Sequence, residues 1–134
     1  MRDLVVDTHS VVWYLSQDKR LSRRARDAFI KAIAGYGHIV IPSIVLVEMI
    51  FLAQRERVNR DIVKLVLDLP EDPAKGIYIY PLNKDVVQAL SHFGPAAIPE
   101  LSDRIIAATA LHLGLPVLTV DPVIQASRLI QTIW

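Results

Sequence analysis

The chain has 134 residues, of which 52% are hydrophobic and 22% are charged, so it is too apolar for a disordered protein and long enough for one domain, 1–134. Fifteen lysines and arginines against fourteen acids leave a formal net charge of +1, which excludes nucleic-acid binding driven by the overall charge and leaves only local patches. The absence of cysteine excludes a disulfide scaffold, a thiolate metal site and a cysteine nucleophile.

Apolar runs that are typical of buried strands alternate with segments of helical periodicity. In the first half of the chain the predicted elements are a strand over Leu4–Val6, helices over Val11–Leu15 and Arg23–Ala34, a strand over His38–Ile41 and a helix over Ile44–Gln54. In the second half they are a helix over Asp61–Leu69, a strand over Ile77–Tyr80, helices over Lys84–His92 and Asp103–Leu113, a strand over Val117–Val120, a short helix near Val123–Ser127 and an edge strand over Ile130–Trp134.

Residues that favour helix N-caps precede most of these helices. The candidates are Thr8 or Ser10, Ser22, Asn59, Asn83 and Ser102. No two strands are joined by a hairpin signal, so the chain is expected to form βαβ units. The predicted class is α/β, with a mostly parallel five-stranded sheet, helices on both faces and a ligand site at the carboxyl ends of the strands.

Two uncharged stretches of sixteen residues, Ala32–Val47 and Ile105–Val120, are the candidates for a membrane span. Both are shorter than the roughly 18 residues that a membrane-spanning helix needs. Each also contains glycine and proline where a strand should meet a helix. The run Leu4–Val6 is too short for the apolar region of a secretory signal. We therefore expect a cytoplasmic protein with no membrane association.

Four acids stand in apolar surroundings. Asp7 and Asp121 end the first and fourth predicted strands, Glu48 interrupts an apolar helix, and Asp103 opens another helix. A buried carboxylate is costly without a compensating cation or hydrogen-bond donors, and only Asp103 has a cationic neighbour in sequence, Arg104. A divalent cation would compensate all four, and oxygen ligands without cysteine or paired histidines suit Mg²⁺ or Mn²⁺.

Local explanations remain open for three of these acids. Asp7 could cap a turn, Asp103 sits in a first helical turn where the helix dipole favours an acid, and Asp121 precedes Pro122 at an ordinary helix start. Nothing local explains Glu48. If the metal interpretation is right, Asp7, Glu48 and Asp103 should lie within the coordination reach of one ion.

Four segments together resemble the PIN-domain nucleases, and most closely the VapC-type toxins of toxin–antitoxin modules. The segments are Val5–His9, Pro42-Ser43 leading to Val47–Met49, Ser102–Ala110 and Leu118–Asp121. The resemblance implies a PIN-like three-layer sandwich and metal-dependent endoribonuclease activity on RNA, with Mg²⁺ or Mn²⁺ as the cofactor. It also implies a homodimer and a cognate VapB-type antitoxin that covers the site.

By motif, the family's acids fall on Asp7, Glu48, Asp103 and Asp121, and a family Ser/Thr falls on Thr119. Hydrolysis of a phosphodiester needs an activated water and neutralised phosphate oxygens, which carboxylate-held ions supply. We expect Asp7 to hold or bridge metal, Glu48 and Asp103 to approach from helices and Asp121 to act through water. The hydroxyls of Thr8 and Thr119 are expected to orient the phosphate or a water.

Further features allow two interpretations each. Arg20, Arg23 and Arg24 form either an RNA-backbone patch or the solvated face of a helix. Trp13 and Phe51 either line a groove for an antitoxin segment or pack in the core. A phosphoacceptor receiver domain is disfavoured because no aspartate ends the third strand. The remaining alternative function is an RNA-processing nuclease of the same family with no toxin role.

Overall fold

A five-stranded sheet is the centre of the fold in the computed structural model, which describes residues 2–134. The strands are β1 (Arg2–Val6), β2 (Gly37–Pro42), β3 (Ile77–Tyr80), β4 (Val117–Leu118) and β5 (Thr132–Ile133), in the order β3-β2-β1-β4-β5. All four strand pairs are parallel. The α/β class and the five strands are therefore confirmed, and the sheet is fully parallel rather than mostly so.

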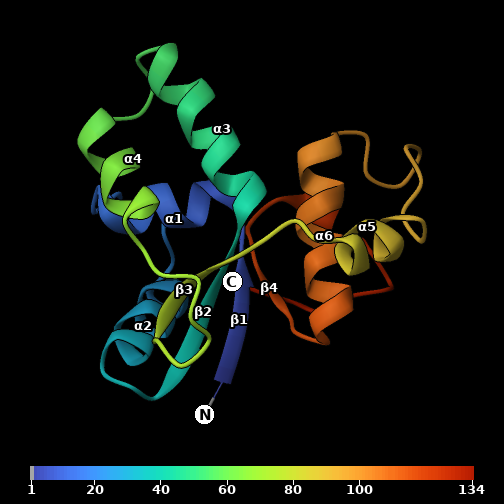
Figure 1. Ribbon diagram of the computed structural model, residues 1–134, viewed down its shortest axis with the longest axis horizontal. Helices are drawn as coiled ribbons and strands as arrows, with labels where there is room; N and C mark the ends of the chain where they lie inside the picture. The colour runs from blue at the N-terminus through green and yellow to red at the C-terminus, as the bar shows by residue number, and fades with distance from the viewer. Residues whose placement is uncertain (1) are drawn as a thin grey trace.

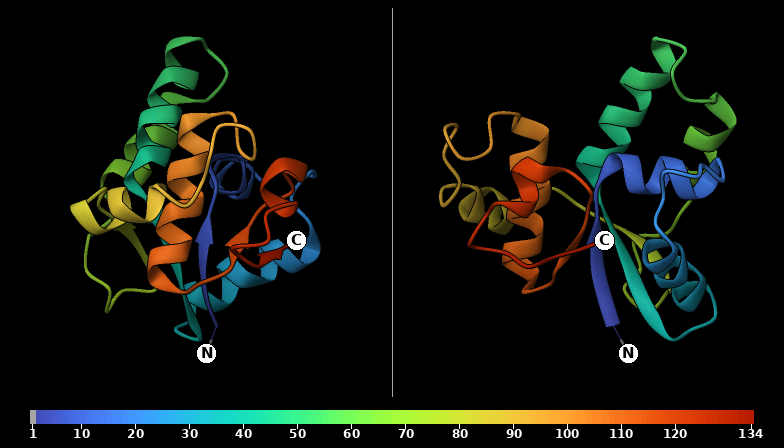
Figure 2. Two further views of the ribbon diagram at one scale, coloured as in Figure 1. Left: turned by 90° about the vertical axis from the view of Figure 1, so that its right-hand side faces the viewer. Right: turned by 180° about the vertical axis from the view of Figure 1, so that it is seen from behind.

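Helices cover both faces of this sheet. They are α1 (Thr8–Leu15), α2 (Arg23–Ile33), α3 (Ser43–Gln54), α4 (Arg60–Leu67), α5 (Lys84–Leu90), α6 (Leu101–Leu113) and α7 (Pro122–Gln125). Figure 1 shows α5 and α6 on one side of the sheet and α1 and α2 on the other, with α3 rising beyond the end of β2. This is the predicted three-layer arrangement, and Figure 2 shows the same layers from the side and from behind.

The core forms around the central strand. Leu4, Val5 and Val6 of β1 are at most 1% exposed, as expected for a strand covered on both faces. On one face β1 is covered by α6, whose Ile106 and Ala110 are fully buried. The first turn of α6 lies near the carboxyl ends of β1 and β4, because Asp103 is close enough to Asp7 and Asp121 for their charges to act on it.

Three of the predicted helix caps are confirmed, namely Ser22, Asn59 and Asn83. Two predictions are wrong. Helix α1 is capped by Asp7, not by Thr8 or Ser10, because the helix begins directly after β1 and the Asp7 carboxylate accepts the Ser10 N–H. Helix α6 begins two residues before the expected start, so Ser102 lies inside it and Glu100 occupies the N-cap position without a side-chain hydrogen bond.

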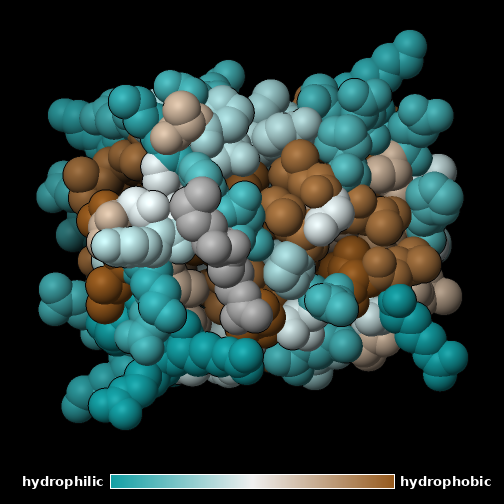
Figure 3. All heavy atoms as spheres, turned by 90° about the horizontal axis from the view of Figure 1, so that it is seen from below, coloured by the Kyte–Doolittle hydropathy of each residue, from teal (hydrophilic) through white to brown (hydrophobic). Residues whose placement is uncertain are grey.

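Two surface properties complete the fold. Within residues 2–134, every helix is too short or too polar to cross a membrane. Figure 3 views the molecule from the end at which β1 begins and shows hydrophobic side chains across the middle, bordered by hydrophilic ones. The predicted site residues belong to the opposite end, where the strands finish.

Candidate active site

Asp7 is fixed at the carboxyl end of β1, in the middle of the sheet. Its side chain is only 6% exposed and accepts the Ser10 N–H at 3.0 Å through Oδ1. Ser10 Oγ lies 2.6 Å from the same oxygen, and the Thr119 hydroxyl donates to Oδ2 at 2.5 Å. Hydrogen bonds to both oxygens compensate for the burial of this carboxylate and set its orientation.

Thr119 connects Asp7 to a second acid. It is fully buried after β4, beside Asp7, because β1 and β4 are paired with Val6 opposite Leu118. While its hydroxyl donates to Asp7, its oxygen accepts the Asp121 N–H at 3.0 Å. Asp121 is half-buried and caps α7 by accepting the Val123 N–H at 2.9 Å. The capping roles that the sequence left open for Asp7 and Asp121 are therefore present.

Glu48 reaches the same edge from α3. Its Oε1 accepts the Thr8 hydroxyl at 2.6 Å, which joins α3 to the first turn of α1. Glu48 is half-buried, and its neighbours Val47 and Phe51 are 45% and 59% exposed. The apolar residues around Glu48 in the sequence therefore do not enclose it, and the acid stands on an apolar but open helix surface.

Asp103, in the first turn of α6, is an acid of this group whose pKa is clearly shifted by its surroundings. Its pKa rises from 3.8 to about 7, first because of burial and then because of the negative charges of Asp121, Glu100, Glu48 and Asp7. Asp103 therefore lies close enough to the other three predicted acids for their charges to act on it. Glu100 was not predicted from the sequence. The available signal was its position one helical turn before Asp103.

No basic side chain balances this cluster in the described part of the chain. The two ion pairs found there, Arg20–Asp18 and His38–Asp3, include none of the acids of the cluster. Arg104 follows Asp103 in sequence, but its guanidinium contacts the Pro99 carbonyl oxygen at 3.3 Å. The site therefore combines oxygen donors with unbalanced negative charge, which fits a hard divalent cation.

Across residues 2–134, no three or more acidic or histidine side chains converge closely enough to hold a metal ion. The expected convergence of Asp7, Glu48 and Asp103 on one ion is therefore not present in this arrangement, and their role as metal ligands stays a prediction. The carboxylates of Asp7 and Glu48 are instead held by hydroxyl groups. Without a cation between them, carboxylates also repel one another, which keeps them apart. The donor set still fits Mg²⁺, since this ion is usually bound by one or two carboxylates and keeps several waters.

Within the protein, the hydroxyl groups of Thr8 and Thr119 contact carboxylates. Their hydroxyl groups donate to Glu48 and Asp7, so they orient these carboxylates.

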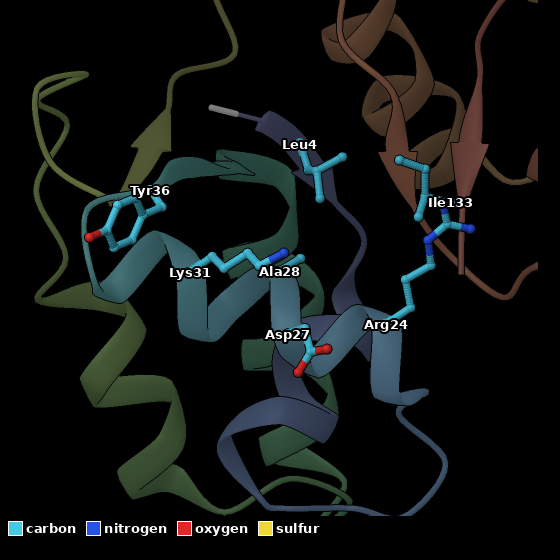
Figure 4. Close-up of a pocket in the computed structure, with 7 residues that line it drawn as sticks. All are labelled: Leu4, Arg24, Asp27, Ala28, Lys31, Tyr36 and Ile133. Carbon is cyan, nitrogen blue, oxygen red and sulfur yellow. The ribbon is translucent and has the colours of Figure 1, made fainter.

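The predicted arginine patch is divided in the structure, because Arg20 and Arg24 line two different hollows. Figure 4 shows Arg24 reaching from α2 toward Ile133 in one of them. The three arginines, with Arg23 at the start of α2, therefore do not line a common hollow.

Comparison with known proteins agrees with this geometry. No curated protein matches the chain by sequence. Among solved structures the chain is similar to that of VapBC2 from Rickettsia felis bound to a DNA fragment from their promoter, with a TM-score of 0.72 and 14% identity over 98% of this chain and 97% of that chain. The PIN domain family matches residues 4–127, which contain all four predicted acids. The chain therefore belongs to the PIN domain family.

Proposed function

We propose that this protein is a metal-dependent endoribonuclease that hydrolyses RNA phosphodiester bonds and acts as the toxin of a type II toxin–antitoxin system. PIN domains are nucleases, and members of the family generally use divalent metal ions. The observation that carries the proposal is the cluster of acids at the carboxyl edge of the sheet, where burial and then the charges of the neighbouring acids raise the pKa of Asp103 to about 7.

Within this proposal Asp7 and Asp103 hold Mg²⁺ or Mn²⁺, and Glu48 and Asp121 complete the site, directly or through water. When bound, the ion would neutralise charge on the scissile phosphate and activate the attacking water. The rigid attachment of Asp7 to Ser10 and Thr119 keeps its carboxylate at one position. We propose that Thr8 and Thr119 are positioning residues for Glu48 and Asp7 rather than direct contacts to RNA.

The partners follow from the same proposal. The similar Rickettsia felis structure is of a VapBC2 complex, which supports a VapB-type antitoxin as the partner of this chain. We also propose a homodimer in the cytoplasm, because the exposed apolar side chains Val47, Ile50 and Phe51 of α3 form a surface that a second copy would cover. An antitoxin arginine paired with the site carboxylates would compete with the metal.

The nuclease activity is tested with purified protein, single-stranded RNA and either Mg²⁺, Mn²⁺ or EDTA. We expect cleavage with either ion and none with EDTA. Asp7→Asn retains the ability to cap α1 but loses the charge, so cleavage should fall by roughly 100-fold or more. The matched control is Asp72→Asn, because Asp72 also accepts a backbone N–H, from Ala74 at 2.9 Å, but lies in an exposed loop. Full activity of Asp7→Asn would refute the metal mechanism.

The toxin role is tested separately by induced expression in a bacterial host. We expect wild-type protein to arrest growth and Asp7→Asn to permit growth. Co-expression of the antitoxin expected from the neighbouring gene should restore growth to cells that make the wild-type protein. Normal growth with an active nuclease would instead support the alternative, an RNA-processing enzyme without a toxin role.

A further inference from the structure

A polar pocket lies beside the acid cluster, between α1, α3 and the segment that leads into α4. It has a volume of about 340 Å³. On α1 and its C-cap residue it is lined by His9, Val12, Trp13 and Ser16, which share one face of the helix. On α3 it is lined by Leu52, one turn after Glu48. The pocket therefore begins within about one helical turn of the acids, because His9 follows Asp7 by two residues and Leu52 follows Glu48 by four.

Planar groups form one wall of this pocket. The guanidinium of Arg20 lies 4.7 Å from the centre of the Trp13 ring. Asp18 fixes the same guanidinium, accepting from Nε at 3.0 Å and from a terminal nitrogen at 2.7 Å. The rings of His9 and Trp134 lie 5.6 and 6.0 Å from that of Trp13. Arginine and aromatic planes held in place in this way are surfaces on which nucleobases stack.

Groups that match the rest of a nucleotide line the same pocket. Arg57 is exposed and supplies a positive charge for a phosphate, and the Asn59 amide, whose oxygen caps α4, can donate its N–H groups to a base edge. The opposite face of α1 is different: Tyr14 and Leu15 line a pocket that contains no charged residue. The mixture of planar, cationic and amide groups thus distinguishes the pocket beside the acids from the apolar pocket on the opposite face of α1.

We infer that this pocket binds one nucleotide of single-stranded RNA next to the cleaved phosphodiester, with its base stacked on the Trp13–Arg20 wall and a phosphate at Arg57. The inference rests on the proposed function, since the nucleotide belongs to the RNA that the acid cluster would cleave. Trp13 and Arg57 are then residues that position the substrate and take no part in the bond-breaking step.

The test measures binding of a short single-stranded RNA in EDTA, so that no strand is cleaved. Each base is removed in turn to give abasic strands, and wild type is compared with Trp13→Leu and Trp13→Phe. We expect one abasic position to weaken binding by wild type roughly fivefold to 100-fold. Trp13→Leu should bind the intact strand correspondingly more weakly and be insensitive to that abasic position, whereas Trp13→Phe, which retains a ring, should stay close to wild type.

Two matched controls accompany this measurement. Tyr36→Leu removes an aromatic side chain that is 70% exposed in a different hollow, and RNA binding should be unchanged. Arg57→Gln should reduce the slope of log affinity against log salt by about 0.7, the value for one phosphate contact on a single strand. Arg55→Gln removes the same charge two residues away, outside the pocket, and should keep the wild-type slope.

The outcomes separate this inference from the function on which it rests. If wild type binds RNA but neither Trp13→Leu nor any abasic position changes the affinity, the nucleotide pocket is wrong, and the pocket is better assigned to a protein partner. If wild type binds no RNA in EDTA and also cleaves none with Mg²⁺ or Mn²⁺, the proposed function itself fails; if it cleaves RNA but binds none in EDTA, the nucleotide pocket is wrong. The abasic series on wild type remains decisive even if Trp13→Leu does not fold.

Discussion

Among single residues, Asp103 links stability to pH most directly. Its pKa of about 7 means that the folded chain keeps a proton on this carboxyl at pH values where the unfolded chain, with an aspartate pKa near 3.8, has released it. Between these two values the folded state binds more protons than the unfolded state. The free energy of unfolding therefore falls as pH rises through this window, because stability rises with pH only where the unfolded state binds more protons.

We accordingly expect the contribution of Asp103 to lower the free energy of unfolding of the metal-free protein as pH rises from about 4 to about 7. Asp103→Asn cannot ionise, so its free energy of unfolding should increase relative to that of wild type over the same range. Urea unfolding at several pH values in EDTA measures both proteins. Parallel pH profiles of the two proteins would contradict the prediction.

Thr119 is the residue on which the arrangement of two acids depends. Thr119→Val keeps the shape of this fully buried side chain but removes the hydroxyl that bonds to Asp7 Oδ2 and to the Asp121 N–H. We expect a loss of about 1–3 kcal/mol in the free energy of unfolding, since two buried polar groups lose a partner. RNA cleavage should fall as well. Thr119→Ser, which keeps the hydroxyl, should recover most of both in parallel denaturation and cleavage assays.

At this scale the sequence predicted the residue types but not their partners. Asp7, Glu48, Asp103 and Asp121 were identified because acids in apolar segments need compensation. The hydrogen bond from Thr8 to Glu48 joins residues 40 positions apart, so no local pattern contains it. Glu100 was missed because an exposed acid near a helix start is common and has a sufficient local explanation in the helix dipole.

Among the elements, β3 and α2 meet at one glycine. A Cβ added to Gly76, just before β3, would lie 2.2 Å from the carbonyl oxygen of Ala32 in α2. Backbone atoms cannot yield as a flexible side chain can, so Gly76→Ala must displace the strand or the helix. We expect a loss of about 1–3 kcal/mol in the free energy of unfolding, the usual cost of overpacking.

Gly94→Ala is the matched control for this prediction. A Cβ at Gly94 meets nothing within 4 Å, and this glycine does not have a positive φ. Its midpoint in thermal denaturation should stay close to that of wild type. Equal midpoints for Gly76→Ala and Gly94→Ala would show that the contact between β3 and α2 is loose.

The elements were predicted well where the signals are local. Ser22, Asn59 and Asn83 begin their helices as expected, because an N-cap interacts with residues two or three positions ahead. Boundaries that depend on tertiary contacts were less accurate. The fourth strand was expected to run to Val120, but β4 ends at Leu118. The next residue, Thr119, is instead engaged by Asp7 and Asp121.

For the whole molecule, the net charge of +1 conceals an uneven distribution. Acids from the ends of β1 and β4 and from α3 and α6 gather at one edge of the sheet, whereas Arg24 lines a separate hollow and Arg20 is paired with Asp18. A near-neutral total therefore coexists with strong local repulsion. A cation that binds only the folded chain relieves this repulsion, so its binding is coupled to folding.

We therefore expect Mg²⁺ or Mn²⁺ to raise the midpoint of thermal denaturation, and a concentration of about 100 times Kd should add about 2.7 kcal/mol to the free energy of unfolding. The increase should be larger at pH 8 than at pH 5, because protons compete with the metal for Asp103. Asp7→Asn should lose most of the increase, and Asp72→Asn should keep it. Thermal shift measurements with NaCl at matched ionic strength separate binding from screening. An equal increase with NaCl would contradict a metal site at this edge.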